Sequence, residues 1–182
     1  MSKSAVIVVD LQKEYLPTGK MALEGVHEAV STARRIIDHA RKTGVPVIHI
    51  RHEEAGENPP AYVPGTEGVE IIEEVAPVGD EPVICKNFPN SFRETELQAQ
   101  LDKLGATQIT MIGAMSHVCI AATGRAATDF GYDVTTIHDA CATMAVEFDG
   151  VTVPASHVHA ANMAALAFAY GRVISADEAL AE

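Results

Sequence analysis

Stretches of continuous apolar residues alternate along the chain with amphipathic stretches, and this pattern predicts an α/β protein. Residues 5–9 are apolar and mostly β-branched, as is typical of a strand that is buried on both faces of a sheet. In the next stretch apolar residues recur at spacings of three and four up to Gly44, which predicts a helix with a glycine C-cap. The apolar positions of this helix are Val26, Ala29, Val30, Ala33, Ile36, Ile37 and Ala40.

The same alternation continues to the end of the chain. Residues 51–66 combine acidic residues with two Gly and three Pro, so they predict a long surface loop. Alternating strands and helices favour right-handed crossovers and a three-layer α/β/α fold, with a six-stranded, mostly parallel, doubly wound sheet. We find no repeat or interdomain linker and expect a single domain over 1–182. We predict the further strands over 45–50, 82–85, 108–112, 134–137 and 173–174, and the further helices over 68–75, 97–104, 117–130 and 154–170.

Composition narrows the range of partners. The formal net charge of −12 argues against binding to nucleic acid or to anionic membranes, because both select basic surfaces. No apolar run reaches the about 18 residues that a membrane-spanning helix needs, and the amino terminus has no secretory pattern. Three cysteines at unpatterned spacing indicate neither a disulfide framework nor a zinc site. We therefore expect a cytoplasmic protein whose partner is a small-molecule substrate.

Three chemically different reactive side chains follow three of the predicted strands. The first strand ends at Asp10, the third at Lys86, and the fourth leads through Gly113 to Cys119. Because parallel strands present their carboxyl ends at one edge of a sheet, where ligands bind, we expect these side chains to lie together. A carboxylate can accept a thiol proton, and an ammonium can stabilise the thiolate. The alternative is an Asp10–Lys86 ion pair that only closes the sheet edge.

Cys119 falls in the first turn of the helix predicted over 117–130, with Ser116 as a natural N-cap. The unpaired N–H groups and positive dipole end of that turn favour a thiolate, so we expect the pKa of Cys119 to be lowered. A small apolar residue that packs a strand–helix junction would occupy the same position. Cys85 alternates with Lys86 along its strand, so we predict a packing role for it, and we expect Cys141 to be structural.

The residues around these positions resemble the isochorismatase-like cysteine hydrolase superfamily. The similarity lies in Asp10-Leu-Gln12, in Lys86, in the segment from Gly113 to Cys119 and in the segment 131–140, and it extends to the late helix. The resemblance implies an Asp10, Lys86 and Cys119 triad and a cis peptide bond before Met115. It also implies an oxyanion hole formed by the backbone N–H groups of Met115 and Cys119.

The resemblance further implies cleavage of a C–N bond in a small amide, carbamoyl compound or lactam, through an acyl-enzyme on Cys119. Relatives that cleave the vinyl ether of isochorismate lack this cysteine, which favours the C–N reading. A vinyl-ether hydrolase and a non-catalytic, redox-sensing relative remain as alternatives. A dinucleotide-binding protein is disfavoured because the turn after the first strand lacks G-x-G-x-x-G and is acidic.

Nicotinamidases in this superfamily carry a metal site that includes an Asp-x-His pair after the second strand. The matching stretch here, 49–54, lacks that pair, so we expect no metal and no cofactor. His49, His52 and Glu53 leave a metal site near the second strand open as an alternative.

Substrate contacts are harder to predict than the triad. Core packing or a surface position is an equally good interpretation of several of the candidates. The helix over 154–170 is apolar nearly all round, which is typical of a buried helix or of a subunit interface, so we expect a homo-oligomer, either a dimer or a tetramer. Our candidates for substrate binding are Gln12, Arg51, Phe88, His117 and Phe148.

Overall fold

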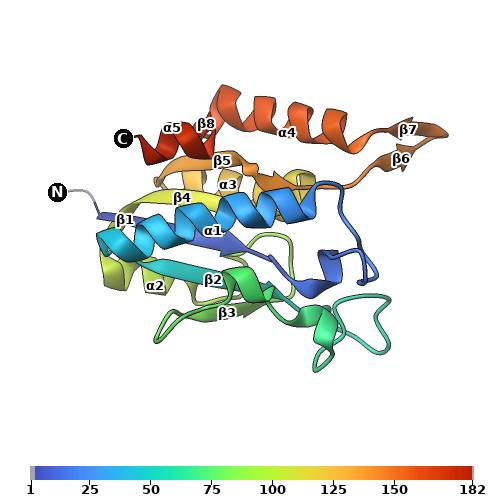
Figure 1. Cartoon of the computed structure of the whole chain (residues 1–182), viewed down its shortest axis with the longest axis horizontal. Helices are drawn as coiled ribbons and strands as arrows, with labels where there is room; N and C mark the ends of the chain where they lie inside the picture. Colours follow the sequence, from blue (N-terminus) through green and yellow to red (C-terminus); the bar gives the residue numbers. More distant parts are fainter. Residues whose placement is uncertain (1–2, 182) are drawn as a thin grey trace.

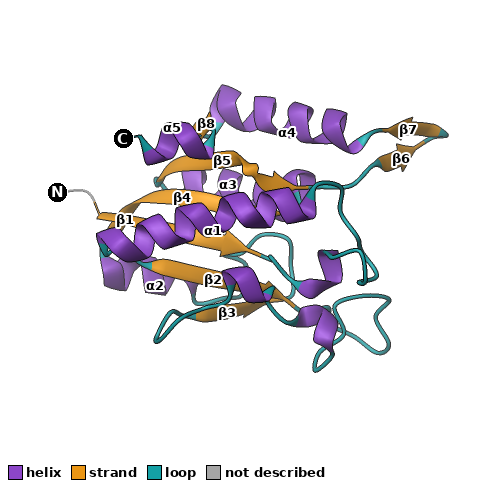
Figure 2. Ribbon diagram, in the orientation of Figure 1, coloured by secondary structure: helices purple, strands orange, loops and turns teal. Residues whose placement is uncertain are grey.

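The structure is a computed structural model and describes residues 3–181. Its main sheet contains six strands in the order β3-β2-β1-β4-β5-β8, and every neighbouring pair is parallel (Figures 1 and 2). The predicted fold class, a doubly wound α/β/α architecture with a six-stranded sheet, is confirmed. The strands are β1 (Lys3–Val9), β2 (Val47–His52), β3 (Val83–Lys86), β4 (Ala106–Ala114), β5 (Asp133–Ala142) and β8 (Arg172–Ile174).

Helices cover both faces of this sheet (Figure 1). Successive side chains of a strand point to opposite faces, so β1 contributes to two cores. Val6 and Val8 pack into one core, and Ile7 and Val9 into the other. The first core lies under α1 (Val26–Thr43) and α5 (Ala176–Leu180), and the second under α2 (Leu97–Leu104), α3 (Ala121–Asp129) and α4 (Ala155–Ala169).

The first helix ends where the sequence predicts. Gly44 adopts the left-handed conformation (φ 74°), and its N–H bonds back to the carbonyl oxygen of Ala40. Glycine has no Cβ and reaches this conformation at little cost, so it satisfies the last carbonyls and stops the helix.

The helix predicted over 68–75 is wrong. Two short 3₁₀ turns, η2 (Glu67–Val69) and η3 (Glu73–Val75), take its place. Between them the chain is extended because it pairs with the segment after β1: the N–H of Lys13 donates to the oxygen of Glu70, and that of Ile72 to the oxygen of Leu11. This tertiary pairing overrides the local preference for helix.

Three further elements were not predicted, and one of them is the short helix α5. A 3₁₀ turn, η1 (Lys13–Tyr15), follows β1, and a hairpin of β6 (Val146–Phe148) and β7 (Val151–Val153) projects from the body of the molecule (Figure 1). The helix predicted over 117–130 begins with a π-helical turn, η4 (Ser116–Ile120), before α3. Three-residue strands and turns of this kind carry too little periodicity to be recognised from sequence.

The late helix α4 is apolar on both its inner and its outer face. Val158, Met163 and Leu166 are buried, the last two in the second core, whereas Phe168 is 92% exposed. Within one chain, therefore, the outer face of α4 is uncovered. Among residues 3–181, none of the helices combines the length and the apolar character that a membrane crossing needs.

Candidate active site

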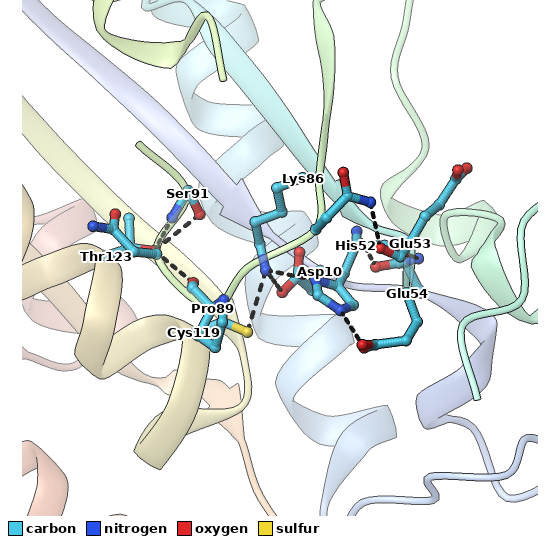
Figure 3. Close-up of polar contacts among 12 residues, drawn as sticks. Asp10, His52, Glu53, Glu54, Lys86, Pro89, Ser91, Cys119 and Thr123 are labelled. Carbon is cyan, nitrogen blue, oxygen red and sulfur yellow. Dashed lines mark hydrogen bonds and ion pairs between the residues drawn. The ribbon is translucent and has the colours of Figure 1, made fainter. Parts of the chain in front are cut away.

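Asp10, Lys86 and Cys119 meet at the carboxyl edge of the sheet (Figure 3). The Lys86 ammonium nitrogen lies 2.8 Å from Asp10 Oδ2 and 3.3 Å from Cys119 Sγ. The side chains of Asp10 and Lys86 are fully buried, and Cys119 is 5% exposed. The three residues that the sequence proposes as a constellation are therefore in contact.

The first of them is held by an unusual backbone. Asp10 follows β1 with a positive φ of 52°, a conformation that few residues other than glycine adopt and that Asp and Asn tolerate best. Its N–H is bonded to the oxygen of Ile50 at the end of β2. Strained positions of this kind cluster at functional sites. Oδ2 pairs with the Lys86 ammonium, and among the residues that the structure describes no group hydrogen-bonds to Oδ1, so the carboxylate keeps acceptor capacity for a proton.

The chain reaches Cys119 through a close approach of β4 to β1. Gly113 has a φ of 130°, and a Cβ at this position would lie 1.9 Å from the carbonyl oxygen of Val9. Only glycine fits there. The peptide bond between Ala114 and Met115 is cis, at the position that the family resemblance implies. Our candidate oxyanion hole consists of the N–H groups of Met115 and Cys119. Met115 directly precedes the π-helical turn, and Cys119 lies within it.

Ser116 is not a helix N-cap, contrary to our prediction. Its hydroxyl lies 2.8 Å from His159 Nδ1 and donates to the oxygen of Ala142 at 3.2 Å. Both partners are far away in the sequence. Ser116 therefore ties the turn before Cys119 to β5 and α4 instead of capping its own helix.

The predicted lowering of the Cys119 pKa is wrong in the resting protein. Burial raises the pKa of this thiol, and the neighbouring Asp10 carboxylate raises it further, while Lys86 acts in the opposite direction without outweighing them. Desolvation penalises a thiolate more than a helix terminus favours it. Cys119 is therefore a protonated thiol when no ligand is bound, next to a carboxylate and an ammonium.

Lys86 contacts a third side chain, His52, which the sequence analysis did not connect with it. Burial alone would lower the pKa of Lys86, but the Asp10 carboxylate and Cys119 outweigh it and raise the pKa, so the side chain is an ammonium. His52 Nδ1 lies 3.2 Å from the ammonium nitrogen. Because an ammonium can only donate, Nδ1 of His52 accepts, and its Nε2–H points to Glu54 at 3.3 Å (Figure 3).

Gln12, a predicted substrate-binding residue, uses its side-chain amide to bind the protein backbone, and its contact with a substrate stays a prediction. Its amide nitrogen donates to the oxygens of His52 and Val69, and its amide oxygen accepts from the N–H of His52. All of these partners are backbone groups. Gln12 therefore clamps the end of β2 against the turn at η2.

Three other substrate-binding candidates each contact a neighbouring side chain. Arg51 forms a 2.7 Å ion pair with Glu53, and Phe88 is half-buried beneath the guanidinium of Arg93. His117 Nδ1 lies 2.7 Å from the hydroxyl of Thr143, and burial lowers its pKa.

Phe148 does not form a wall of the site within one chain. It is 83% exposed on the β6–β7 hairpin, which projects away from the sheet (Figure 1). The sequence could not reveal this, because the hairpin itself was not predicted.

The histidines of β2 do not converge on a metal site. His49 is buried and donates to Glu81, which also accepts two bonds from Arg41, whereas His52 contacts Lys86. Within residues 3–181, no group of three or more His, Cys, Asp or Glu side chains is arranged to hold a metal ion.

Two tyrosines near the triad were missed by the sequence analysis. Tyr15 follows Gln12 in η1, and Tyr62 lies in the long loop after β2; both are buried and their rings meet edge to face at 5.6 Å. Burial raises the pKa of both phenols, and Asp10 and Cys119 raise them further. The only local signal is an aromatic residue in a polar loop, which does not identify a partner.

The remaining cysteines divide between a surface and a core position. Cys85 is exposed on the edge strand β3, so its predicted packing role is wrong: no further strand covers that edge. Cys141 is buried, and its thiol donates to the oxygen of Ile137, as expected of a structural residue.

Comparison with known proteins agrees with this geometry. Residues 4–178 match the family model of the isochorismatase domain. The chain is 44% identical to the isochorismatase family protein YddQ of Bacillus subtilis, over 93% of this chain and 94% of YddQ. It is 29% identical to Nicotinamidase 3 of Arabidopsis thaliana, over 96% of this chain and 86% of that protein.

Solved structures give the same result. The crystal structure of a protein assigned to the isochorismatase hydrolases of Oleispira antarctica superposes with a TM-score of 0.94 at 42% identity, covering 100% of this chain and 97% of that one. Both the sequence and the fold therefore place this chain in the isochorismatase family.

Proposed function

We propose that the protein is a cysteine hydrolase that cleaves a C–N bond, of the amide or carbamoyl type, in a small molecule. The observation that carries this proposal is the contact of one buried ammonium, Lys86, with both Asp10 and Cys119. Membership of a hydrolase family that includes a nicotinamidase supports an amide-type substrate. We assign no cofactor and no metal to the reaction.

Proton transfer from Cys119 to Asp10 starts the reaction. Because the resting thiol is protonated, it loses its proton to the Asp10 carboxylate as the sulfur attacks the carbonyl carbon. Lys86 balances the negative charge that is shared between the sulfur and the carboxylate. No free thiolate has to persist in the buried site, which fits the raised pKa of the thiol.

The attack forms a C–S bond and a tetrahedral oxyanion, which the N–H groups of Met115 and Cys119 stabilise. When this intermediate collapses, the C–N bond breaks and the proton on Asp10 goes to the leaving nitrogen. Water then attacks the thioester with Asp10 again as base. The acyl group leaves as a carboxylic or carbamic acid, and the sulfur recovers its proton.

Burial argues against the redox-sensing alternative. Redox-sensing cysteines are accessible and have a low pKa, whereas Cys119 is 5% exposed and its pKa is raised. Cys85 is the exposed cysteine, and because successive side chains of a strand point to opposite faces, it points away from the buried side chain of Lys86. We therefore favour covalent catalysis at Cys119.

Arg51, Phe88 and His117 remain our candidates for contacts with the substrate. We also propose that the protein is a homo-oligomer, because the outer face of α4 leaves Phe168 uncovered in one chain. Light scattering coupled to gel filtration measures this, and a monomer at micromolar concentration would contradict it.

Replacement of Cys119 tests the proposed function. We screen the wild type against small amides, ureides and carbamates and follow the intact mass for an acyl adduct. Cys119→Ala should lose at least about a thousandfold in turnover and form no adduct, while Cys85→Ser should behave as the wild type. Near wild-type turnover by Cys119→Ala would exclude the covalent route.

A further inference from the structure

The Tyr62 hydroxyl is a buried donor without a partner. Tyr62 is 8% exposed, its oxygen is inaccessible, and no described group lies within hydrogen-bonding distance and angle of it. Burying a hydroxyl without a hydrogen bond costs free energy, so exceptions of this kind require an explanation. The phenol of Tyr15 lies close enough to act on the pKa of Tyr62 as a hydrogen-bonding neighbour, but the distance and angle between the two groups fall outside those of a formed hydrogen bond.

Tyr62 is linked to the triad through His52. Its ring meets the ring of His52 edge to face, with 5.1 Å between centroids, and His52 in turn contacts the Lys86 ammonium at 3.2 Å. Asp10 and Cys119 both act on the Tyr62 phenol, raising its pKa beyond the effect of burial. Figure 3 shows the His52 side chain next to Asp10 and Lys86.

The backbone holds Tyr62 firmly at this position. Its N–H donates to Glu14 Oε1 at 3.0 Å, and its carbonyl oxygen accepts from the N–H of Glu54 at 3.0 Å, which closes the loop between them. Tyr62 has a positive φ of 53°, a conformation that is rare for a bulky residue. The loop therefore accepts backbone strain at the residue whose hydroxyl is unpaired, a combination that indicates function.

We propose that Tyr62 is a substrate-binding residue whose hydroxyl donates a hydrogen bond to an oxygen or nitrogen of the small polar amide that reacts with Cys119. This inference rests on the proposed function and narrows its substrate class. The substrate therefore carries a hydrogen-bond acceptor within reach of the Tyr62 hydroxyl. Analogues without that acceptor are rejected, because they leave the Tyr62 hydroxyl unpaired in the complex as well.

The stability of Tyr62→Phe gives a first test that needs no substrate. This substitution removes only the hydroxyl. If the hydroxyl has no partner in the free protein, the melting temperature does not fall and rises by up to about 4 °C. Tyr132→Phe, a matched change at a half-buried residue that stacks on Phe92, serves as the control for removal of a phenol oxygen elsewhere. A melting temperature that falls for Tyr62→Phe would show a structural partner and overturn the proposal.

Alkylation of Cys119 gives the second test. Iodoacetamide carries an amide acceptor next to the carbon that the sulfur attacks, whereas allyl bromide carries none. In a Cys85→Ser background, we expect Tyr62→Phe to slow the reaction of Cys119 with iodoacetamide about tenfold relative to its reaction with allyl bromide, the change that loss of one hydrogen bond brings. An unchanged ratio of the two rate constants would overturn the proposal.

The two proposals can fail separately. If the wild type hydrolyses no amide and forms no acyl adduct, the proposed function fails, and the alkylation ratio still decides whether Tyr62 binds an amide at Cys119. If amides are hydrolysed and Tyr62→Phe keeps the full kcat/KM on them, the role of Tyr62 fails and the function stands.

Discussion

Asp10 and Lys86 form a fully buried ion pair although their strands are not neighbours in the sheet. The two groups lie 2.8 Å apart, and β2 runs between β1 and β3. The long lysine side chain spans that strand along the carboxyl edge. A buried ion pair is weak support for stability, because desolvation offsets most of the attraction. Its position beside Cys119 is the one that the proposed reaction requires.

Breaking this pair should separate stability from activity. Asp10→Asn keeps a residue that tolerates the positive φ, yet it leaves the Lys86 ammonium without its counter-charge, so we expect a loss of about 3–5 kcal/mol in the free energy of unfolding. Lys86→Met should cost a similar amount. The double variant should recover much of the stability, since no buried charge is left unpaired, while all three variants lose turnover by at least about a hundredfold.

Urea unfolding and steady-state kinetics measure the two effects. A double variant that is as unstable as the sum of the single ones would mean that the pair is not the source of the loss.

The pH dependence of Cys119 alkylation should shift in opposite directions in the two single variants. The Asp10 carboxylate raises the pKa of Cys119 and Lys86 lowers it. Asp10→Asn should therefore make the thiol react with iodoacetamide at lower pH, with a rate at pH 8 that is about tenfold higher or more. Lys86→Met should move the profile to higher pH. Peptide mass spectrometry distinguishes Cys119 from the exposed Cys85, which serves as the internal control. Shifts of the same sign in both variants would refute the charge assignment.

Glu81 should make the protein sensitive to acid. Burial alone would raise its pKa, but hydrogen bonds from Arg41, the N–H of Val78 and His49 lower it to about 2. A carboxyl whose folded pKa is lowered stabilises the protein above its unfolded pKa of about 4.3 and loses this contribution as the pH falls toward the folded value. We expect Glu81→Gln to cost about 1–2 kcal/mol at pH 7 and less at pH 2.5.

Unfolding of the wild type and of Glu81→Gln by urea between pH 7 and pH 2.5 checks this expectation. Glu67→Gln is the control, because Glu67 is 80% exposed in its pair with Lys13, and it should change stability by less than about 0.5 kcal/mol at either pH. A cost of Glu81→Gln that is independent of pH would contradict the role of its charge.

Gly113→Ala should be far more damaging than Gly131→Ala. Both glycines have a positive φ, but a Cβ at Gly113 would lie 1.9 Å from the backbone of Val9, whereas at Gly131 nothing lies within 4 Å. We expect a loss of at least about 3 kcal/mol for Gly113→Ala and about 1–2 kcal/mol for Gly131→Ala, which introduces only the cost of the left-handed conformation. Thermal unfolding compares them, and equal losses would show that the close approach of β4 to β1 is unimportant.

The sequence determines the architecture and which three reactive side chains meet at the edge of the sheet, for a simple physical reason. Strand and helix periodicities are local, and parallel strands end at one edge, so Asp10, Lys86 and Cys119 had to come close once the order of elements was known. Residues that lie directly at strand ends are predictable in this way. The end of α1 at Gly44 is predictable too, because its cap is formed by neighbouring residues.

Only the tertiary structure decides the environment of those residues. The pKa of Cys119 depends on burial by segments that are distant in the sequence, and this reversed the prediction made from its helical turn. Ser116, Gln12 and Tyr62 are held in place by partners at least 26 residues away, on β5, β2 and η1. Their local sequence carries no trace of those partners. Long-range contacts are fixed by packing of the whole chain, whereas the sequence pattern describes only what neighbouring residues prefer.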